Sequence, residues 1–203
     1  MYNLKINDFT DKLSSAAPVP GGGGASALMG GIASSLCSMV ANLTTGKKKY
    51  AEYQPDIDRI LETVPKLTEE ILELINKDAE AFEPLSKAYS IPKDMEGRDE
   101  LLENALRVAS DAPFAIVEKM VEVTDLIEEL TIKGSRLAIS DVGVAACACA
   151  AAVKGASMNV FINTKLMKDR EYAASMNEKT ISIVNDVVER CDKAYKTVLE
   201  GLM

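Results

Sequence analysis

Asp78 is the residue of this 203-residue sequence whose position most suggests chemistry. Apolar residues recur at alternating steps of three and four, which is the pattern of a helix-bundle seam: Ile57, Ile60, Val64, Leu67, Ile71 and Leu74. The next position of that seam is Asp78. A carboxylate on an apolar seam loses hydration, which raises its pKa unless a cation or several donors compensate. We interpret Asp78 as a group for proton transfer or ligand contact. The alternatives are an outward orientation in a helix whose prolines shift its phase, or a buried hydrogen bond that fixes register.

The composition strengthens the interpretation of Asp78 as a proton-transfer group, because the chain has no histidine. Without imidazole, Ser-His-Asp, Cys-His and histidine-containing zinc sites are excluded. Proton transfer near neutral pH then needs a carboxylate, lysine, tyrosine or thiol with a displaced pKa. The 31 acidic against 23 basic residues, a net charge of -8, argue against a broad surface for nucleic acid or an anionic membrane. We expect neither as a partner, and no metal site.

A glycine run is the second candidate, and it precedes an uncharged helical segment. Pro20 is followed by Gly21, Gly22, Gly23 and Gly24. Free backbone N–H groups at a helix N-terminus suit a carbonyl or an anion, and the alternative is a flexible connection between two helices. The run is neither a Walker A loop nor a dinucleotide fingerprint, because no Lys-Ser/Thr follows it and no strand precedes it.

A cationic cluster, Lys47, Lys48 and Lys49, follows the same helical segment. Lysines there complement the helix dipole, which is a purely structural interpretation. In a chain this acidic, three adjacent lysines are also the best place for a polycarboxylate or a phosphate.

Three polar residues of the last third of the chain complete the candidates. Asp141 adjoins a face of small residues, where it could bind a donor-rich heterocycle or cap a helix. Asn159 and Asn163 lie four apart on one helical face, where they could present amides to a ligand or satisfy the helix terminus.

The elements that must position these residues are helices, because helical periodicity runs through the chain and strand signals are scarce. Helices are predicted over 25–43, 57–90 with kinks or short breaks at Pro65 and Pro84, 99–109, 113–134 with Pro113 in its first turn, 135–163, and 171–202. We predict one all-α domain over residues 1–203, an up-and-down bundle. Two helices are apolar nearly all round, which predicts a homo-oligomer that buries a helix face.

The rest of the composition bears on membrane insertion, on the cellular compartment and on how a ligand is held. The uncharged stretch 25–43 is long enough to span a bilayer, but its Gly, Ala and Ser content favours a buried helix that packs closely. The N-terminus lacks a signal-peptide pattern, and we interpret the four cysteines as small buried residues of a reducing cytoplasm. With 5% aromatic residues, we expect backbone and amide contacts rather than ring stacking to hold a ligand.

Five ordered motifs together resemble the cyclodeaminase/cyclohydrolase family: PVPGGGGASA, SMVANLTTGKKKY, KDAEAF, SDVGVA and MNVFIN. This family contains the C-terminal domain of formiminotransferase-cyclodeaminase and stand-alone methenyltetrahydrofolate cyclohydrolases. The resemblance runs from about Leu4 to the C-terminus and implies a dimeric helical enzyme acting on tetrahydrofolates. It implies that Asp78 is catalytic and that the other candidates line the folate site.

The resemblance leaves the reaction open. The motifs look closer to the cyclohydrolases, which convert 5,10-methenyltetrahydrofolate to 10-formyltetrahydrofolate. The alternatives are a cyclodeaminase acting on 5-formiminotetrahydrofolate, and a folate-binding or scaffold subunit without catalysis. No cofactor beyond the tetrahydrofolate substrate is implied. The tail carboxylates of folate would reach the lysines, and the pterin would lie near the glycines and Asp141.

Overall fold

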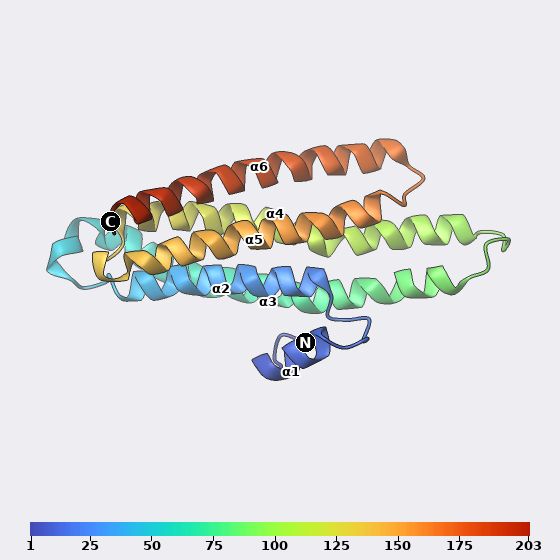
Figure 1. Cartoon of the computed structure of the whole chain (residues 1–203), viewed down its shortest axis with the longest axis horizontal. Coiled ribbons are helices and arrows are strands. Elements are labelled where there is room, and N and C mark those ends of the chain that lie inside the picture. Colours follow the sequence, from blue (N-terminus) through green and yellow to red (C-terminus); the bar gives the residue numbers. More distant parts are fainter.

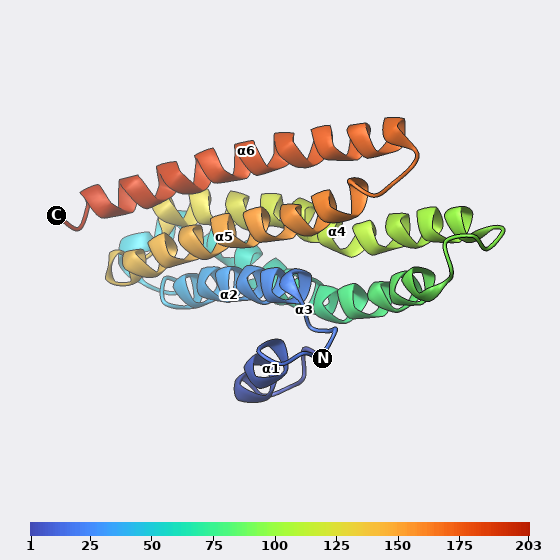
Figure 2. The ribbon, with the colours of Figure 1, turned by 45° about the vertical axis from the view of Figure 1, so that its right-hand side comes forward.

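The protein is a bundle of antiparallel helices. The computed structural model describes residues 1–203, and all of its regular elements are helical. They are α1 (Ile6–Leu13), α2 (Gly22–Asn42), the 3-10 helix η1 (Lys48–Tyr53), α3 (Gln54–Ser90), α4 (Arg98–Lys133), the 3-10 helix η2 (Arg136–Ala138), α5 (Ile139–Thr164) and α6 (Arg170–Glu200). From α2 to α6 each long helix reverses the direction of the one before, which confirms the predicted up-and-down bundle (Figure 1). The short α1 projects from it in both views (Figure 2).

The predicted seams form the core. Along α3, the six apolar seam residues from Ile57 to Leu74 are all buried. On α4, Ile116, Met120 and Ile127 are fully buried at the corresponding spacing. These residues belong to one apolar cluster to which all five long helices contribute, so the helix positions are fixed mainly by burial of this surface.

Small residues bring α2 and α5 close to their neighbours. A Cβ added at Gly30 would lie 3.2 Å from Ile71, and one added at Gly155 would lie 3.5 Å from the Cβ of Ser26. Helix α2 thus packs through small residues, as predicted. Both α2 and the segment 136–164 are long and apolar enough to span a membrane by length and composition alone.

Three prolines lie inside continuous helices, which corrects the predicted boundaries. Helix α3 runs unbroken through Pro65 and Pro84, and α4 runs unbroken through Pro113 rather than starting there. Each proline removes the donor for the carbonyl four residues earlier. Pro65 and Pro84 are exposed, so water can reach the backbone near them. Pro113 is buried, and the carbonyl of Ala109 accepts a hydrogen bond from Asn163 Nδ2 at 2.9 Å instead.

The unequal helix lengths create a step in the bundle. Helices α3 and α4 have 37 and 36 residues, whereas α2 and α5 have 21 and 26. The α3–α4 hairpin therefore continues beyond the N-terminus of α2 and the C-terminus of α5 (Figure 1). This step lies next to Asp78.

The cysteines depart in part from expectation. All four are free, and Cys37, Cys149 and Cys191 are buried as predicted. Cys147, in contrast, is exposed on α5.

Candidate active site

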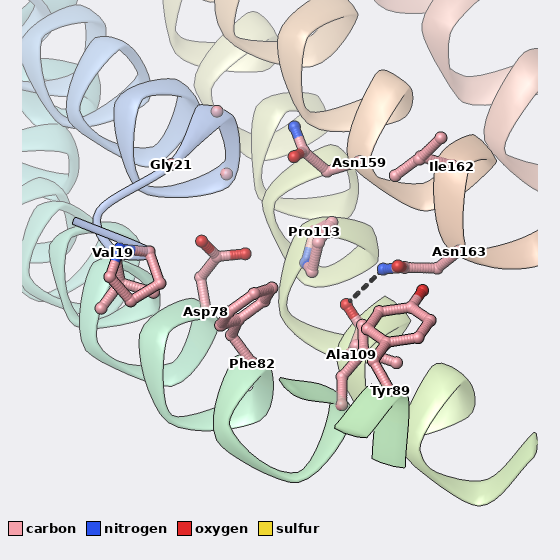
Figure 3. Close-up of a pocket in the computed structure, with 14 residues that line it drawn as sticks. Val19, Gly21, Asp78, Phe82, Tyr89, Ala109, Pro113, Asn159, Ile162 and Asn163 are labelled. Atoms are coloured by element: carbon pink, nitrogen blue, oxygen red, sulfur yellow. Dashed lines mark hydrogen bonds between the residues drawn. The ribbon is translucent and has the colours of Figure 1, made fainter. Parts of the chain in front are cut away.

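A pocket occupies the step between the short and the long helices (Figure 3). Its volume is about 250 Å³. The walls come from the loop before α2, the first turn of α2, and the facing parts of α3, α4 and α5: Pro18, Val19, Gly21, Gly22, Gly23, Asp78, Phe82, Leu85, Tyr89, Ala109, Pro113, Asn159, Ile162 and Asn163. Asp78 is the one charged residue among them, so the pocket presents a single negative charge on an otherwise neutral wall.

Asp78 points from α3 toward the first turn of α2 (Figure 3). The side chain is half-buried and forms no ion pair. Burial raises the pKa of Asp78, while a hydrogen bond from the backbone of Gly24 acts in the opposite direction. Because desolvation is the larger effect, the carboxyl group binds a proton more tightly than an ordinary aspartate, as the sequence predicted.

The glycine run forms the surface against which Asp78 lies. A Cβ added at Gly23 would be 2.6 Å from Asp78 Oδ2 and closer still to Oδ1, so only glycine leaves room for the carboxylate. A Cβ at Gly22 would meet the Asn159 amide at 3.2 Å, whereas one at Gly21 would meet nothing within 4 Å. Helix α2 has no side-chain cap from its N-cap residue Gly21, and the Asp78 carboxylate of α3 instead accepts a hydrogen bond from the backbone of Gly24 in the first turn.

The two asparagines reach the pocket from α5, but their amides are partly engaged. Asn159 Nδ2 donates to the carbonyl of Gly155 at 2.9 Å. Asn163 Nδ2 donates to the carbonyl of Ala109, which ties α5 to α4 beneath the pocket (Figure 3). Both residues therefore line the pocket, and Asn163 also has a structural role, because it satisfies a carbonyl of α4 rather than the terminus of its own helix.

Other predicted site residues lie elsewhere. Pro20 and Gly24 are not part of the pocket lining, although the Gly24 backbone contacts Asp78, and a Cβ added at Gly24 would lie 3.2 Å from Pro20. Lys47, Lys48 and Lys49 follow the C-terminus of α2, and Asp141 is in the first turn of α5. These four lie at the opposite end of the bundle from Asp78, so one chain does not bring them into this pocket.

Several pocket residues were not predicted. Phe82, Leu85 and Tyr89 extend the Asp78 seam of α3 by steps of four, three and four, and that spacing was the available signal. Two aromatic rings thus line the pocket, beside the backbone and amide groups that were expected to contact a ligand. Pro113 and Ala109 carried no such signal, because their exposure to the pocket depends on how α4 faces α3.

Comparisons with known proteins agree with this architecture. Residues 5–182 match the sequence model of the formiminotransferase-cyclodeaminase family. The chain is 37% identical over 200 residues to the methenyltetrahydrofolate cyclohydrolase of Methylorubrum extorquens, covering 97% of this chain and 96% of that protein. It is 28% identical to the formimidoyltransferase-cyclodeaminase of Sus scrofa over 190 residues, which span 35% of that longer protein.

A solved structure gives the same result at the level of the fold. The formiminotetrahydrofolate cyclodeaminase of Thermotoga maritima superposes with a TM-score of 0.85 at 31% identity, covering 97% of this chain and 98% of that one. The fold and the sequence therefore agree with one family. The chain belongs to the formiminotransferase-cyclodeaminase family.

Proposed function

We propose that this protein is a methenyltetrahydrofolate cyclohydrolase in one-carbon metabolism, which hydrolyses 5,10-methenyltetrahydrofolate to 10-formyltetrahydrofolate. The observation that carries the proposal is the Asp78 carboxylate, half-buried without a counter-ion beside the N-terminus of α2. The similarity to a cyclohydrolase along nearly the whole length of both chains supports this reaction.

The charge of the pocket suits the substrate of this reaction. The bridging carbon of 5,10-methenyltetrahydrofolate belongs to a cationic amidinium, which attracts a carboxylate in a site of reduced polarity. Phe82 and Tyr89 supply flat apolar surface for a ring system. The amide groups of Asn159 and Asn163 supply polar contacts at the opposite wall.

Asp78 acts twice in the proposed mechanism. A water molecule forms a C–O bond to the bridging carbon as Asp78 accepts one of its protons, which gives a neutral tetrahedral carbinolamine. Protonated Asp78 then returns this proton to N5 as the C–N5 bond breaks. The hydroxyl group loses its remaining proton as the formyl C=O bond forms on N10. The balance is one water consumed and one proton released.

The runner-up function is formimidoyltetrahydrofolate cyclodeaminase, which the likeness to the Thermotoga maritima structure favours. In that reaction N10 attacks the formimino carbon of 5-formiminotetrahydrofolate, and Asp78 donates a proton to the departing ammonia. The same pocket suits both reactions, because each forms a tetrahedral centre at the carbon that bridges N5 and N10.

A parallel assay of the two substrates separates the candidates. Purified protein, dialysed against EDTA, is incubated with 5,10-methenyltetrahydrofolate or with 5-formiminotetrahydrofolate. We expect loss of the near-ultraviolet absorbance of the first substrate and no ammonia from the second. Ammonia release with formation of the methenyl compound would assign the cyclodeaminase. Folate binding without turnover would leave a binding subunit, and no binding would indicate a scaffold.

The proposal extends to the oligomeric state, the cofactor requirement and the cellular compartment of the protein. We propose that the protein acts as a homodimer, without metal or cofactor beyond the folate substrate, in the cytoplasm. Helices α2 and α5 support the dimer, because each keeps an apolar face at the surface of the single chain: Ile32, Met39, Val144, Met158 and Ile162 are between 38% and 60% exposed.

A further inference from the structure

The pocket contains two amide side chains whose oxygen atoms are unpaired. Four of its 14 lining residues have polar side chains: Asp78, Tyr89, Asn159 and Asn163. An ionised carboxylate only accepts hydrogen bonds, whereas an amide has a donating nitrogen and an accepting oxygen. The contacts of the two asparagines therefore decide which of these atoms a ligand meets.

Backbone carbonyl groups hold both amide nitrogens. Asn159 Nδ2 donates to the carbonyl of Gly155 at 2.9 Å, one turn earlier on α5. Asn163 Nδ2 donates to the carbonyl of Ala109 on α4 at 2.9 Å. A reversed amide would set an oxygen against each of these carbonyl oxygens, so the hydrogen bonds define the orientation of both side chains. The two Oδ1 atoms are the ends that remain free.

Neither Oδ1 atom accepts a hydrogen bond from the chain. For Asn163 this is notable, because the residue is only 9% exposed and buried polar groups are normally paired. Every polar side-chain atom that is sealed from solvent has a hydrogen-bond partner in this structure. The unpaired oxygen of Asn163 is therefore open to the pocket that the residue lines.

The two oxygens belong to one face of α5. Asn159 and Asn163 are four residues apart, which places their Cβ atoms about 5–6 Å from each other. The asparagines of α5 lie across the pocket from Asp78 of α3 (Figure 3). The first turn of α2 packs on the amide of Asn159, since a Cβ added at Gly22 would lie 3.2 Å from its Nδ2. A ligand in the pocket thus meets a carboxylate on one side and two amide oxygens on the other.

The proposed substrate has one part that suits each side. N5 and N10 of 5,10-methenyltetrahydrofolate carry no hydrogen, so the cationic amidinium attracts a carboxylate but cannot donate to an amide oxygen. The N–H donors lie on the pterin rings, at N3, at N8 and at the 2-amino group. Only the 2-amino group has two hydrogens on one nitrogen. Two acceptors bound to such a group at about 2.9 Å lie about 5 Å apart, which matches side chains one helical turn apart.

We propose that the Oδ1 atoms of Asn159 and Asn163 each accept a hydrogen bond from the 2-amino group of the pterin. The pair selects a ring that carries this group and turns the bridging carbon toward Asp78. This inference rests on the proposed function for the identity of the ligand. A site that pairs its own polar groups with substrate N–H groups rejects an analogue without them, because its acceptors then stay unpaired.

An analogue without the amino group tests the assignment. Tetrahydrofolate and 2-desamino-2-methyltetrahydrofolate are titrated into wild-type protein by calorimetry in anaerobic buffer. Neither ligand carries a bridging carbon, so no turnover intervenes. We expect the Kd of the analogue to be at least about tenfold higher, because two acceptors lose their donor. Equal Kd values would overturn this inference and leave the proposed function standing, whereas no binding of either ligand would remove both.

A protein variant completes a double-mutant cycle between side chain and ligand. Asn159→Leu removes one acceptor at similar size; Asn159 is the better choice because Asn163 also holds the Ala109 carbonyl. We expect the variant to bind tetrahydrofolate more weakly and the analogue as wild type does, so the ratio of the two Kd values falls at least about threefold. An unchanged ratio would exclude Asn159 as a partner of the 2-amino group.

Two further variants separate the acceptor from the local structure. Asn42 Nδ2 also donates to a carbonyl one turn earlier, that of Ser38 at 2.9 Å, but Asn42 is exposed outside the pocket. Asn42→Leu should keep the wild-type ratio of Kd values. Asn159→Asp retains an acceptor oxygen and should keep the preference for the 2-amino ligand. A fallen ratio in either variant would show that an acceptor at Asn159 is not what selects the ligand.

Turnover distinguishes recognition of the ring from a contact with the attacking water. If Asn159 holds the pterin, Asn159→Leu should raise the KM for 5,10-methenyltetrahydrofolate more than it lowers kcat. A lower kcat at unchanged KM, together with an unchanged ratio of Kd values, would assign the amide to the water molecule. That result would overturn the inference.

Discussion

Asp78 combines burial, a missing counter-ion and a helix N-terminus in one side chain. Burial of this carboxylate destabilises the folded state, because desolvation disfavours the ionised form and so raises the pKa of Asp78 above the ordinary value. A buried carboxylate that lowers the free energy of unfolding is typical of catalytic positions, where the shifted pKa prepares the group for proton transfer. The glycines opposite Asp78 fit the same interpretation, since Gly23 leaves the space that the carboxylate fills.

The raised pKa of Asp78 predicts a pH-dependent difference in stability. Because the folded state binds this proton more tightly than the unfolded state, ionised Asp78 lowers the free energy of unfolding at neutral pH. This loss disappears as the pH falls through the raised pKa toward the ordinary value near 3.9. Asp78→Asn should thus be more stable than wild type at pH 7, by a margin that shrinks on acidification. Urea unfolding of both proteins at several pH values measures this difference in the free energy of unfolding. An Asp78→Asn variant less stable than wild type at pH 7 would contradict the desolvation argument.

A second residue-scale prediction concerns the glycine opposite Asp78. Gly23→Ala introduces a Cβ into the space of the carboxylate, so Asp78 must move. A displacement of about 1 Å at a catalytic group costs on the order of 100-fold in rate, and we expect a loss of that size in kcat/KM. Gly21→Ala is the matched control, because its Cβ meets nothing within 4 Å. Comparable activity of the two variants would mean that the position of Asp78 does not control the rate.

At the scale of elements, Pro113 and Asn163 connect the active site to the packing of α4 against α5. Pro113 deprives the Ala109 carbonyl of its helical donor, and Asn163 supplies a replacement from α5. A carbonyl left without a donor in a buried place costs about 1–3 kcal/mol. The hydrogen bond that α4 lacks at Pro113 is thus replaced by one that joins α4 to α5, two walls of the pocket.

This arrangement predicts coupled effects on stability. Asn163→Ala should lower the free energy of unfolding by about 1–3 kcal/mol, because the Ala109 carbonyl loses its donor. In a Pro113→Ala background the helix can supply its own N–H, so the same change should cost less. A double-mutant cycle by urea unfolding measures this coupling. Strictly additive effects would show that Asn163 and Pro113 act separately.

The helix seams were predictable from sequence, and the helix ends were less so. The spacing from Ile57 to Leu74 predicted the buried side of α3 and placed Asp78 on it, because periodicity depends on local sequence alone. Pro113 misled the prediction of a helix start, because its cost is offset by Asn163, fifty residues away. Asp141 and Lys48 were assigned to one site with Asp78, but motif order does not reveal that helices of this length carry them to the other end.

At the scale of the whole molecule, the exposed apolar side of α2 and α5 supports the proposed homodimer. A single chain leaves an apolar face at its surface and a neutral-to-negative pocket at one end. Contiguous exposed apolar surface of this kind marks an interaction site. A second copy packed on this face would cover it, as in the proposed homodimer.

One substitution tests this explanation far from the pocket that its own chain forms. Val144 is 53% exposed near the start of α5, among the exposed apolar residues of that helix. Val144→Glu should dissociate the proposed homodimer in sedimentation velocity and preserve helical circular dichroism, because a charge would be buried in the contact. Ile132→Glu is the control, since Ile132 is 67% exposed but lies on α4. An intact pair in Val144→Glu would place the contact on another face.

The most direct test of the central claim is the rate at which Asp78→Asn consumes 5,10-methenyltetrahydrofolate. Positioned acid–base groups contribute about 10²- to 10⁴-fold, so we predict a loss of at least about 100-fold in kcat for a variant that remains folded. Asp111→Asn is the matched control, because burial also raises the pKa of Asp111, which lies outside the pocket. It should retain wild-type activity. Wild-type turnover by Asp78→Asn would contradict the account.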